Sequence, residues 1–451
     1  MTDYSSFTAL QLGEMIKNRE LTSPELCEYF LNKADGFNSF IYRDKDAVMK
    51  QAQTVQKAIE SGRLNSVFAG VPIAIKDNIC VKGMPASCGS KMLESFVPPY
   101  DATVVSRIKN AGMVVLGKTN MDEFAMGSTG ETSHFGAVKN PLDVSRAAGG
   151  SSSGSAAAVA GGLAPLSLGS DTGGSVRLPA AYCGLYGLKP TYGAVSRFGL
   201  IAYASSLDTV GAICKTAEDA AVLFNAISGV DKKDSTSINS EKIVINKNIK
   251  TSNIKISILG NAKSEAFKAL NINVENAELS LLKYAVPAYY IIACAEASSN
   301  LARYDGIRYG HRSDKAKTLD EVYTLSRTEG FGFEVKKRIM LGNFVLSSGY
   351  FDEYYLKALK VRGMIKSELL SLLEKSDYIL APVSENGAPL LGQSLEKPLD
   401  MYSGDVFNVL ANLAGLPALS LPGGVQLIGK PNSEESLINL ALKLEKEIYG
   451  I

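Results

Sequence analysis

Two glycines stand directly before a serine in the stretch GSDTGGSVRLP, residues 169–179. Consecutive backbone N–H groups of such a loop can point the same way and bind an oxyanion. If the hydroxyl of Ser175 attacks a carbonyl carbon, these amides would stabilise the negative oxygen that forms. The amides in question belong to Thr172, Gly173, Gly174 and Ser175 itself. Asp171 and Arg177 bracket the loop, and we expect an ion pair between them to hold it in place.

A nucleophilic serine needs a base, and histidine is scarce in this chain. His134 and His311 are the only histidines, so we consider lysine, which accepts a proton only when it is neutral. Lys76 ends the apolar run VPIAIK, and burial would disfavour its ammonium form and lower its pKa toward neutrality. The alternatives are a surface lysine at this position and a glycine turn without chemistry before Ser175.

The stretch AGGSSSGSAAAVAGG, residues 148–162, raises three alternatives: a flexible linker, a phosphate-binding loop or the rim of an active site. Its segment Gly150–Gly154 fits the G-x-S-x-G pattern of a hydrolase nucleophile elbow. That elbow requires a strand before the serine and a partner histidine after it, whereas the preceding KNPLDVSRAAGG is turn-like. From the local pattern we therefore expect an exposed polar loop.

Two other short patterns are set aside for physical reasons. The segment Gly112–Thr119 fits the phosphate-loop pattern, but its four middle residues are apolar and read as a buried strand. A phosphate loop needs small, flexible residues followed by a helix that begins at the lysine. Ser106 and Lys109 fit S-x-x-K, but they lie on an amphipathic helix, where a solvated face explains them better.

Helical and strand patterns alternate along the chain, which predicts an α/β fold with a mixed or largely parallel sheet. The chain up to about Gly62 reads as helices, with a capping box at Thr8 and Gln11 and a cap at Ser23. Further helices are expected at 46–61, 101–112 (capped by Asp101), 154–162 and 216–229. Strands are expected within 67–79 and at 113–116, 164–168, 254–259, 378–381 and 416–421.

Bulk composition excludes several classes of function. The 451 residues carry 47 basic and 46 acidic side chains, a balance that predicts no dominant nucleic-acid ligand. No secretory signal or bilayer-spanning apolar run is recognisable, so we expect a cytoplasmic protein without membrane association. The six cysteines are scattered without CxxC pairs, which favours reduced, buried thiols over disulfides or zinc. With so few histidines, we expect no metal site.

The chain contains three separated motifs: GVPIAIKDNI, GGSSSGS and DTGGSVRLPAAYCGLYGLKPTYG. Together these motifs resemble the amidase-signature family. That resemblance implies a single large α/β domain with a central mixed sheet flanked by helices on both faces. It also implies amide cleavage by a Ser–cis-Ser–Lys triad: Ser175 as nucleophile, Ser151 as the bridging serine on a cis peptide, and Lys76 as base. The stretch at 148–162 would then be a rim of the active site.

Four other segments carry a second resemblance: KTNMDEFAMGSTGETSHFG, RYDGIRYG, VKKRIMLGNFVLSSGYFDEYY and MYSGDVFNVLANLAGLPALSLP. Together they resemble the A-subunit family of glutamyl-tRNA(Gln) amidotransferases. The resemblance implies that the chain hydrolyses glutamine and passes ammonia to a B subunit, with a small C subunit clasping both. It places ATP and Mg²⁺, and most tRNA contacts, on the B subunit, with no cofactor on this chain. Matched positions imply that Arg338 holds the α-carboxylate of glutamine and Asp405 its α-ammonium, with Tyr289 and Ser128 nearby.

The resemblance suggests three segments: an N-terminal helical part (1–65), a core with the triad (66–230) and the remainder of the same domain (231–451), with a helical lobe at 262–370 that covers the substrate. Residues 231–253 are polar and read as a loop. The segments after residue 230 and near residue 424 look shortened relative to the family. A stand-alone amidase for another small amide and a non-catalytic assembly subunit remain alternatives, as does service of Asp-tRNA(Asn).

Overall fold

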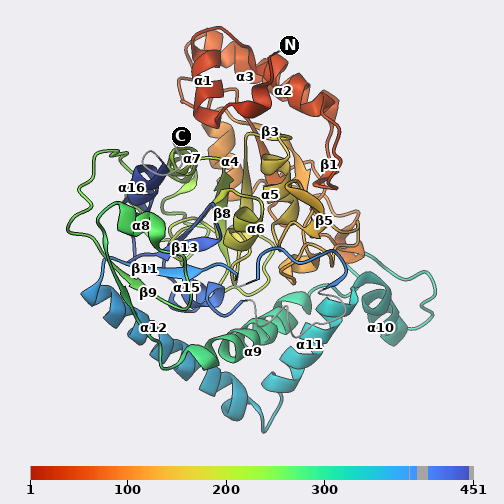
Figure 1. The fold of residues 1–451 in the computed structure, drawn as a ribbon. Coiled ribbons are helices and arrows are strands. Elements are labelled where there is room, and N and C mark those ends of the chain that lie inside the picture. The colour runs from red at the N-terminus through yellow and green to blue at the C-terminus, as the bar shows by residue number, and fades with distance from the viewer. Residues whose placement is uncertain (1, 385, 394–404, 446–451) are drawn as a thin grey trace.

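The computed structural model describes residues 2–384, 386–393 and 405–445. Its centre is an eleven-stranded mixed sheet (Figure 1). From edge to edge the strands are β1 (Phe40–Tyr42), β3 (Val114–Thr119), β2 (Pro72–Lys76), β6 (Leu166–Asp171), β8 (Thr209–Cys214), β7 (Tyr186–Lys189), β12 (Ala418–Leu421), β13 (Val425–Ile428), β11 (Tyr378–Pro382), β9 (Lys255–Ile258) and β10 (Asn273–Asn276). β2 pairs in parallel with β3 and β6, β9 pairs in parallel with β10 and β11, and the other pairs of this sheet are antiparallel. β4 (Lys139–Asn140) and β5 (Asp143–Ala147) form a separate hairpin.

Helices cover both faces of the sheet, which confirms the predicted fold class. The helical segments are η1 (Tyr4–Ser6), α1 (Ala9–Lys17), α2 (Ser23–Asn32), α3 (Lys45–Glu60), η2 (Lys91–Leu93), α4 (Thr103–Asn110), η3 (Glu123–Ala125), α5 (Ser153–Ala160), α6 (Arg177–Tyr182), α7 (Ala217–Ile227), α8 (Glu265–Ala269), α9 (Leu282–Leu301), α10 (Leu319–Gly330), α11 (Phe333–Leu346), the π-helical η4 (Phe351–Leu356), α12 (Lys357–Lys375), α15 (Asn408–Ala414) and α16 (Glu434–Leu444). Successive strand residues point to opposite faces. On β11, Tyr378 and Leu380 belong to the buried cluster that includes α7 and α16, whereas Ile379 and Ala381 belong to a second cluster with residues of α9, α12 and α15.

The N-terminal helices α1–α3 lie at one end of the molecule, opposite α9, α11 and α12 (Figure 1). The capping box of α1 is the predicted pair Thr8 and Gln11. The cap of α2 lies one residue earlier than predicted, because Thr22, not Ser23, accepts the Glu25 N–H. The sequence patterns also missed the short edge strand β1 between α2 and α3.

The segment 101–119 differs from expectation in one detail and agrees in another. Asp101 does not cap α4; it accepts hydrogen bonds from the Lys82 N–H and the Lys109 amine, and the N-cap position is Ala102. The predicted strand is present as β3, and the lysine of its phosphate-loop-like pattern, Lys118, is buried within it. A lysine inside a strand cannot open a phosphate-binding helix, so the pattern is not a phosphate loop.

The described part of 262–370 is helical from α9 onward, and 231–253 contains neither helix nor strand among its described residues. In the shortened region a five-residue helix, α8, joins β9 to β10, and Pro422 begins a tight turn between β12 and β13. All six cysteines are among the described residues, and each is buried with a free thiol. No described helix is long and apolar enough to cross a membrane.

Candidate active site

The sheet brings the predicted base and nucleophile to one edge. Lys76 is the last residue of β2, and Asp171 is the last residue of the parallel neighbour β6. All of β2 is buried, because its PIAIK sequence is apolar up to the lysine and it lies between β3 and β6. The carboxyl ends of parallel strands open at the same edge, where α/β proteins commonly bind ligands. The loop that leaves β6 at this edge carries Ser175 and leads into α6.

The Lys76 amine is fully buried among serine oxygens. Its Nζ lies 2.8 Å from Ser151 Oγ, 2.9 Å from Ser170 Oγ and 3.3 Å from the Ser170 carbonyl oxygen. Burial lowers the pKa of Lys76 to about 7, although nearby aspartates oppose the shift. The prediction of a buried lysine with a lowered pKa is confirmed, and a surface position is excluded.

The Gly150–Ser151 peptide bond is cis, as the family resemblance implies. The local pattern predicted an exposed polar loop at 150–154. That prediction is wrong, because these residues are buried. They are covered because the stretch packs against the Ser175 loop and the end of β6: Ser152 N–H donates to the Ser175 carbonyl (3.1 Å), and Ser152 Oγ donates to the carbonyl of Ser170 (3.1 Å). The two serine-bearing segments are therefore neighbours.

A buried ion pair holds the Ser175 loop. Asp171 lies 3.1 Å from Arg177, and both side chains are fully buried, which confirms the predicted pair. Burial disfavours the Asp171 carboxylate, but the charge and hydrogen bonds of Arg177 outweigh it and lower the pKa of Asp171. The carboxylate also accepts the Gly174 N–H (2.8 Å) and the Val176 N–H (3.1 Å). The loop thus differs from expectation at Gly174, whose amide is directed at Asp171.

Ser175 faces a pocket that also contains every predicted substrate-binding residue. Its lining includes Ser128, Gly173, Ser175, Tyr289, Arg338 and Asp405. Gly173 lets Tyr289 approach the loop, because a Cβ at position 173 would lie 2.5 Å from the tyrosine hydroxyl. Ser128 lies beside the cis segment, since its carbonyl accepts the Gly150 N–H (2.8 Å). Residues 401–404 of the motif that contains Asp405 lie outside the described residues.

Arg338 and Asp405 are both almost completely buried in this pocket. Arg338 Nε donates to Glu334 Oε1 (2.8 Å), one helical turn earlier on α11, and Nη1 donates to the Tyr203 hydroxyl (2.5 Å). Burial raises the pKa of Asp405 to about 7, while a hydrogen bond from Tyr290 (3.0 Å) and the charge of Arg338 oppose the shift. The pocket therefore presents one cation and one carboxylate, which a free amino acid requires.

Several contributors escaped the sequence patterns. Ser170 is a second hydroxyl partner of Lys76, and Asn78 donates to the same hydroxyl (2.9 Å). Tyr290 stands directly after the predicted Tyr289, so the Tyr-Tyr pair was a usable signal. Nothing in the local sequence pointed to Tyr203, because its partner Arg338 is 135 positions away.

A serine-dependent amidase needs a base beside a serine, a second serine on a loop with backbone donors, and a pocket for its substrate. The arrangement of Lys76, Ser151, Ser175 and the charged pocket meets these needs. The "Amidase" family model matches residues 25–438, and the chain belongs to this family. The A subunit of glutamyl-tRNA(Gln) amidotransferase from Agathobacter rectalis is 48% identical over 474 aligned positions, covering 98% of this chain and 94% of that protein.

Two solved structures share the fold. The A subunit of the Thermotoga maritima glutamyl-tRNA(Gln) amidotransferase has a TM-score of 0.81 at 37% identity, covering 99% of this chain and 96% of that chain. The peptide amidase of Stenotrophomonas maltophilia has a TM-score of 0.81 at 26% identity, covering 99% and 98%. The alignment with the Agathobacter protein spans more positions than the 451 residues of this chain, so that relative has residues without counterparts here.

Proposed function

We propose that this chain is the glutaminase subunit of a tRNA-dependent amidotransferase, which hydrolyses glutamine and supplies ammonia for converting Glu-tRNA(Gln) to Gln-tRNA(Gln). The observation that carries the proposal is the buried Lys76 amine, 2.8 Å from Ser151 Oγ. The segment of Ser151 is hydrogen-bonded to the Ser175 loop, and Ser175 lines a pocket together with Arg338 and Asp405. Relatives of the A-subunit family with 46–48% identity along nearly the whole chain support the choice of reaction.

In the first half of the reaction, Ser175 Oγ attacks the side-chain carbonyl carbon of glutamine. Its proton passes to Ser151, whose own proton passes to neutral Lys76. The oxyanion accepts hydrogen bonds from amides of the Ser175 loop; with the Gly174 N–H directed at Asp171, the remaining donors are Thr172, Gly173 and Ser175. A pKa near 7 means that a large fraction of Lys76 is neutral at physiological pH.

In the second half, the proton on Lys76 returns through Ser151 to the leaving nitrogen. The C–N bond breaks, ammonia leaves, and a glutamyl ester remains on Ser175. Water then attacks the ester carbonyl, giving up its proton through Ser151 to Lys76, and Ser175 takes a proton back as glutamate departs. The side-chain nitrogen of glutamine leaves as ammonia, and water supplies the new carboxylate oxygen of glutamate.

Arg338 and Asp405 select a free amino acid in this proposal. Arg338 binds the α-carboxylate and Asp405 the α-ammonium, while Tyr289 and Ser128 line the same pocket. Buried charge-assisted hydrogen bonds are stronger than those at the surface, so two such contacts discriminate against amides that lack either group. This clamp separates a glutaminase from an amidase for other small amides.

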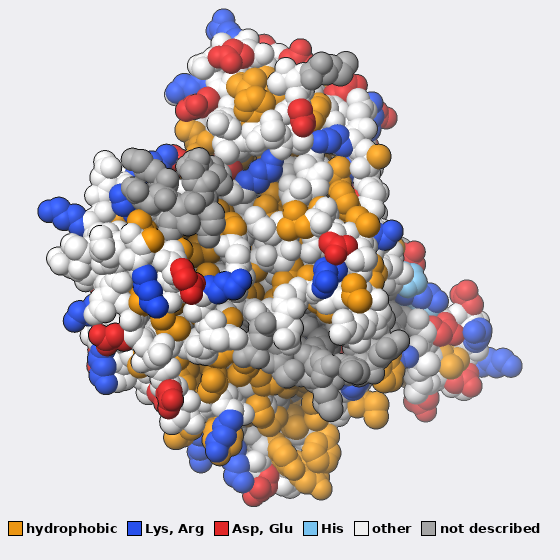
Figure 2. Space-filling view, in the orientation of Figure 1, with side chains coloured by type: hydrophobic (Ala, Val, Ile, Leu, Met, Phe, Trp, Pro, Cys, Tyr) orange, Lys and Arg blue, Asp and Glu red, His pale blue; other side chains and the backbone are white. Residues whose placement is uncertain are grey.

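The partners belong to the same proposal: a B-type subunit that holds ATP, Mg²⁺ and most of the tRNA, and a small C-type subunit, in a cytoplasmic complex. An exposed apolar face on α11 supports a partner surface, since Phe333, Met340 and Phe344 are 77%, 72% and 44% exposed. Figure 2 shows hydrophobic side chains gathered at the lower end of the molecule, where the lobe helices lie in Figure 1.

The test is a glutaminase assay of wild-type protein and Ser175→Ala, alone and with co-expressed B- and C-type subunits. We expect the variant to keep its fold and its partners and to lose activity by about 10⁴-fold or more, because no other hydroxyl replaces the nucleophile. Turnover like that of the wild type in Ser175→Ala would end the catalytic assignment. Glutamine hydrolysis that ignores the partners, with no amidation of Glu-tRNA, would favour a stand-alone amidase.

A further inference from the structure

Asp208 is a fully buried carboxylate, located just before β8, that connects two parts of the site. Its Oδ1 accepts the Thr172 hydroxyl (2.7 Å) and the Ala204 N–H (3.2 Å), and its Oδ2 accepts the Tyr203 N–H (3.0 Å). Burial raises the pKa of Asp208 to about 6, although these donors oppose the shift. Both carboxylate oxygens therefore accept hydrogen bonds, and the residue is only 3% exposed.

On one side, Asp208 holds the catalytic loop. Thr172 is the first residue after β6 and precedes the two glycines and Ser175. The Asp171 carboxylate accepts hydrogen bonds from the Gly174 and Val176 amides of this loop. The Asp208 carboxylate accepts a further hydrogen bond from the Thr172 hydroxyl, so two carboxylates hold the loop. The direction of the Thr172 and Gly173 amides therefore depends on where Asp208 lies.

On the other side, Asp208 holds the turn that supports the substrate clamp. The Tyr203 hydroxyl accepts a hydrogen bond from Arg338 Nη1 (2.5 Å), and the Arg338 guanidinium also lies 5.5 Å from the centre of the Tyr203 ring. Asp208 fixes the backbone of the same tyrosine. Arg338 thus receives its position from its helix partner Glu334 and from a residue that Asp208 holds.

We propose that Asp208 is a positioning residue. It fixes the oxyanion-binding loop relative to Arg338, the side chain that binds the α-carboxylate of the substrate. The inference rests on the proposed function, because it assigns those two groups to one substrate. A free amino acid must place its side-chain carbonyl at the loop and its α-carboxylate at Arg338 simultaneously. One carboxylate that fixes both ends sets the separation between them, and therefore the length of substrate that fits.

The chain offers a matched control in Asp219 on α7. Asp219 is also buried, burial also raises its pKa to about 6, and it accepts two backbone N–H groups, those of Ala9 and Leu10 (both 3.0 Å). Those contacts attach α1 to α7, on the N-terminal side of the molecule, and none of them reaches the pocket. Replacing either aspartate by asparagine leaves a backbone N–H facing an amide donor, so the two variants share the loss of a backbone hydrogen bond.

The experiment measures glutamine kcat and KM for Asp208→Asn and Asp219→Asn in the reconstituted complex, with thermal unfolding of each. We expect both variants to unfold at lower temperature than the wild type. Asp208→Asn should lower kcat by about tenfold and raise KM by about tenfold, since each is the effect of roughly one misplaced hydrogen bond. Asp219→Asn should leave both kinetic constants within about twofold.

Two single-sided variants keep the proposal testable even if Asp208→Asn does not fold. Thr172→Val should lower kcat with little change in KM, and Tyr203→Phe should raise KM with little change in kcat. A double variant, Thr172→Val with Asp208→Asn, should cost less in kcat than the product of the two single effects, because both substitutions act on the same Thr172–Asp208 contact.

The results of these measurements distinguish a failure of the Asp208 inference from a failure of the proposed function. If wild-type complex hydrolyses glutamine and Asp208→Asn changes stability alone, as Asp219→Asn does, Asp208 is merely structural and the inference is overturned. Equal effects of Thr172→Val and Tyr203→Phe on kcat and KM would also overturn it. If the wild-type complex does not hydrolyse glutamine, the proposed function fails first, and the comparison of variants is then made with the amide it does cleave.

Discussion

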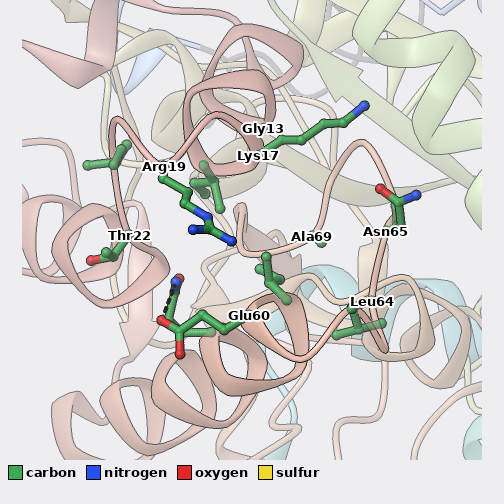
Figure 3. Close-up of a pocket in the computed structure, with 14 residues that line it drawn as sticks. Gly13, Lys17, Arg19, Thr22, Glu60, Leu64, Asn65 and Ala69 are labelled. Carbon is green, nitrogen blue, oxygen red and sulfur yellow. Dashed lines mark hydrogen bonds between the residues drawn. The ribbon is translucent and has the colours of Figure 1, made fainter.

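Two of the hollows in the described part of the molecule differ in almost every respect. A crevice of about 540 Å³ separates α1, the start of α2, the end of α3 and the loop at 62–69 at the N-terminal end (Figure 3). The other hollow is the pocket in front of Ser175, at the sheet edge that carries Lys76. Pocket size alone would draw attention to the crevice.

The charged side chains of the crevice are exposed to solvent, unlike those of the catalytic pocket. Lys17, Arg19 and Glu60 are all exposed, and in Figure 3 Arg19 reaches across the hollow while Lys17 points away from it. Glu60 accepts a hydrogen bond from Gln56 on its own helix (3.0 Å). Hydrated charges of this kind contribute little to stability and are not tuned for chemistry. Desolvation, as at Lys76, changes what a side chain can do.

The largest expected effect breaks the chemistry of the buried hollow. Lys76→Ala removes the proton acceptor of the proposed mechanism, and we expect kcat to fall by about 10⁴-fold because no other base in the described part of the chain hydrogen-bonds to Ser151. Formation of the glutamyl ester, measured as a burst in rapid-mix experiments, should disappear. Lys17→Ala in the crevice is the control and should retain the burst. A normal burst in Lys76→Ala would show that another group accepts the proton.

Arg338→Ala and Arg19→Ala compare the same substitution in the two hollows. Loss of the buried guanidinium removes the proposed contact to the α-carboxylate, and we expect KM for glutamine to rise by about 100-fold, the value of a charge-assisted hydrogen bond in a desolvated site. The measurement is steady-state kinetics on glutamine and on a small amide without an α-carboxylate. Unchanged glutamine kinetics in Arg338→Ala would favour a different amide as substrate.

The pH dependence sharpens the comparison, because the buried hollow contains groups that titrate near neutrality. The mechanism needs neutral Lys76, whose pKa is about 7, so kcat should fall about tenfold per pH unit below that value. Asp405, with a pKa of about 7, must be ionised to bind an ammonium, so kcat/KM should fall more steeply than kcat on the same side. A rate that rises on acidification would contradict a neutral lysine base.

The smallest effect is expected in the crevice. Arg19→Ala and Glu60→Gln should leave glutamine kcat/KM within about twofold and change the free energy of unfolding by no more than about 0.5 kcal/mol, as for exposed side chains in general. Denaturant titration and the glutaminase assay check both numbers. A large loss of activity in either variant would mean that the N-terminal end communicates with the catalytic pocket.

Local sequence was sufficient where one segment contains its own physical reason. The five buried residues of β2 end in Lys76, and an apolar strand that runs straight into a lysine predicts a buried amine. Asp171 and Arg177 are six positions apart on one tight loop, so their pairing was foreseeable. The capping box of α1 is likewise a pattern of four residues.

Sequence patterns failed where packing between distant segments decides the outcome. The stretch at 150–154 reads as an exposed loop by composition, yet it is buried, because the segment before Ser153 packs against the Ser175 loop. The Gly174 amide was expected to face an oxyanion, but a nearby carboxylate accepts its N–H. Neither result follows from glycine and serine content.

The sequence by itself determined the chemical inventory and several local conformations: a lysine at the end of an apolar strand, serines in glycine-rich stretches, and an arginine and an aspartate that are far apart in the chain. Only the tertiary structure decided that Lys76 meets Ser151 across 75 positions, and that Asp208 meets Thr172 across 36. The reason is that strand order and helix packing, rather than residue type, set which distant segments share a sheet edge. Burial at that edge then changes the pKa values on which the proposed chemistry depends.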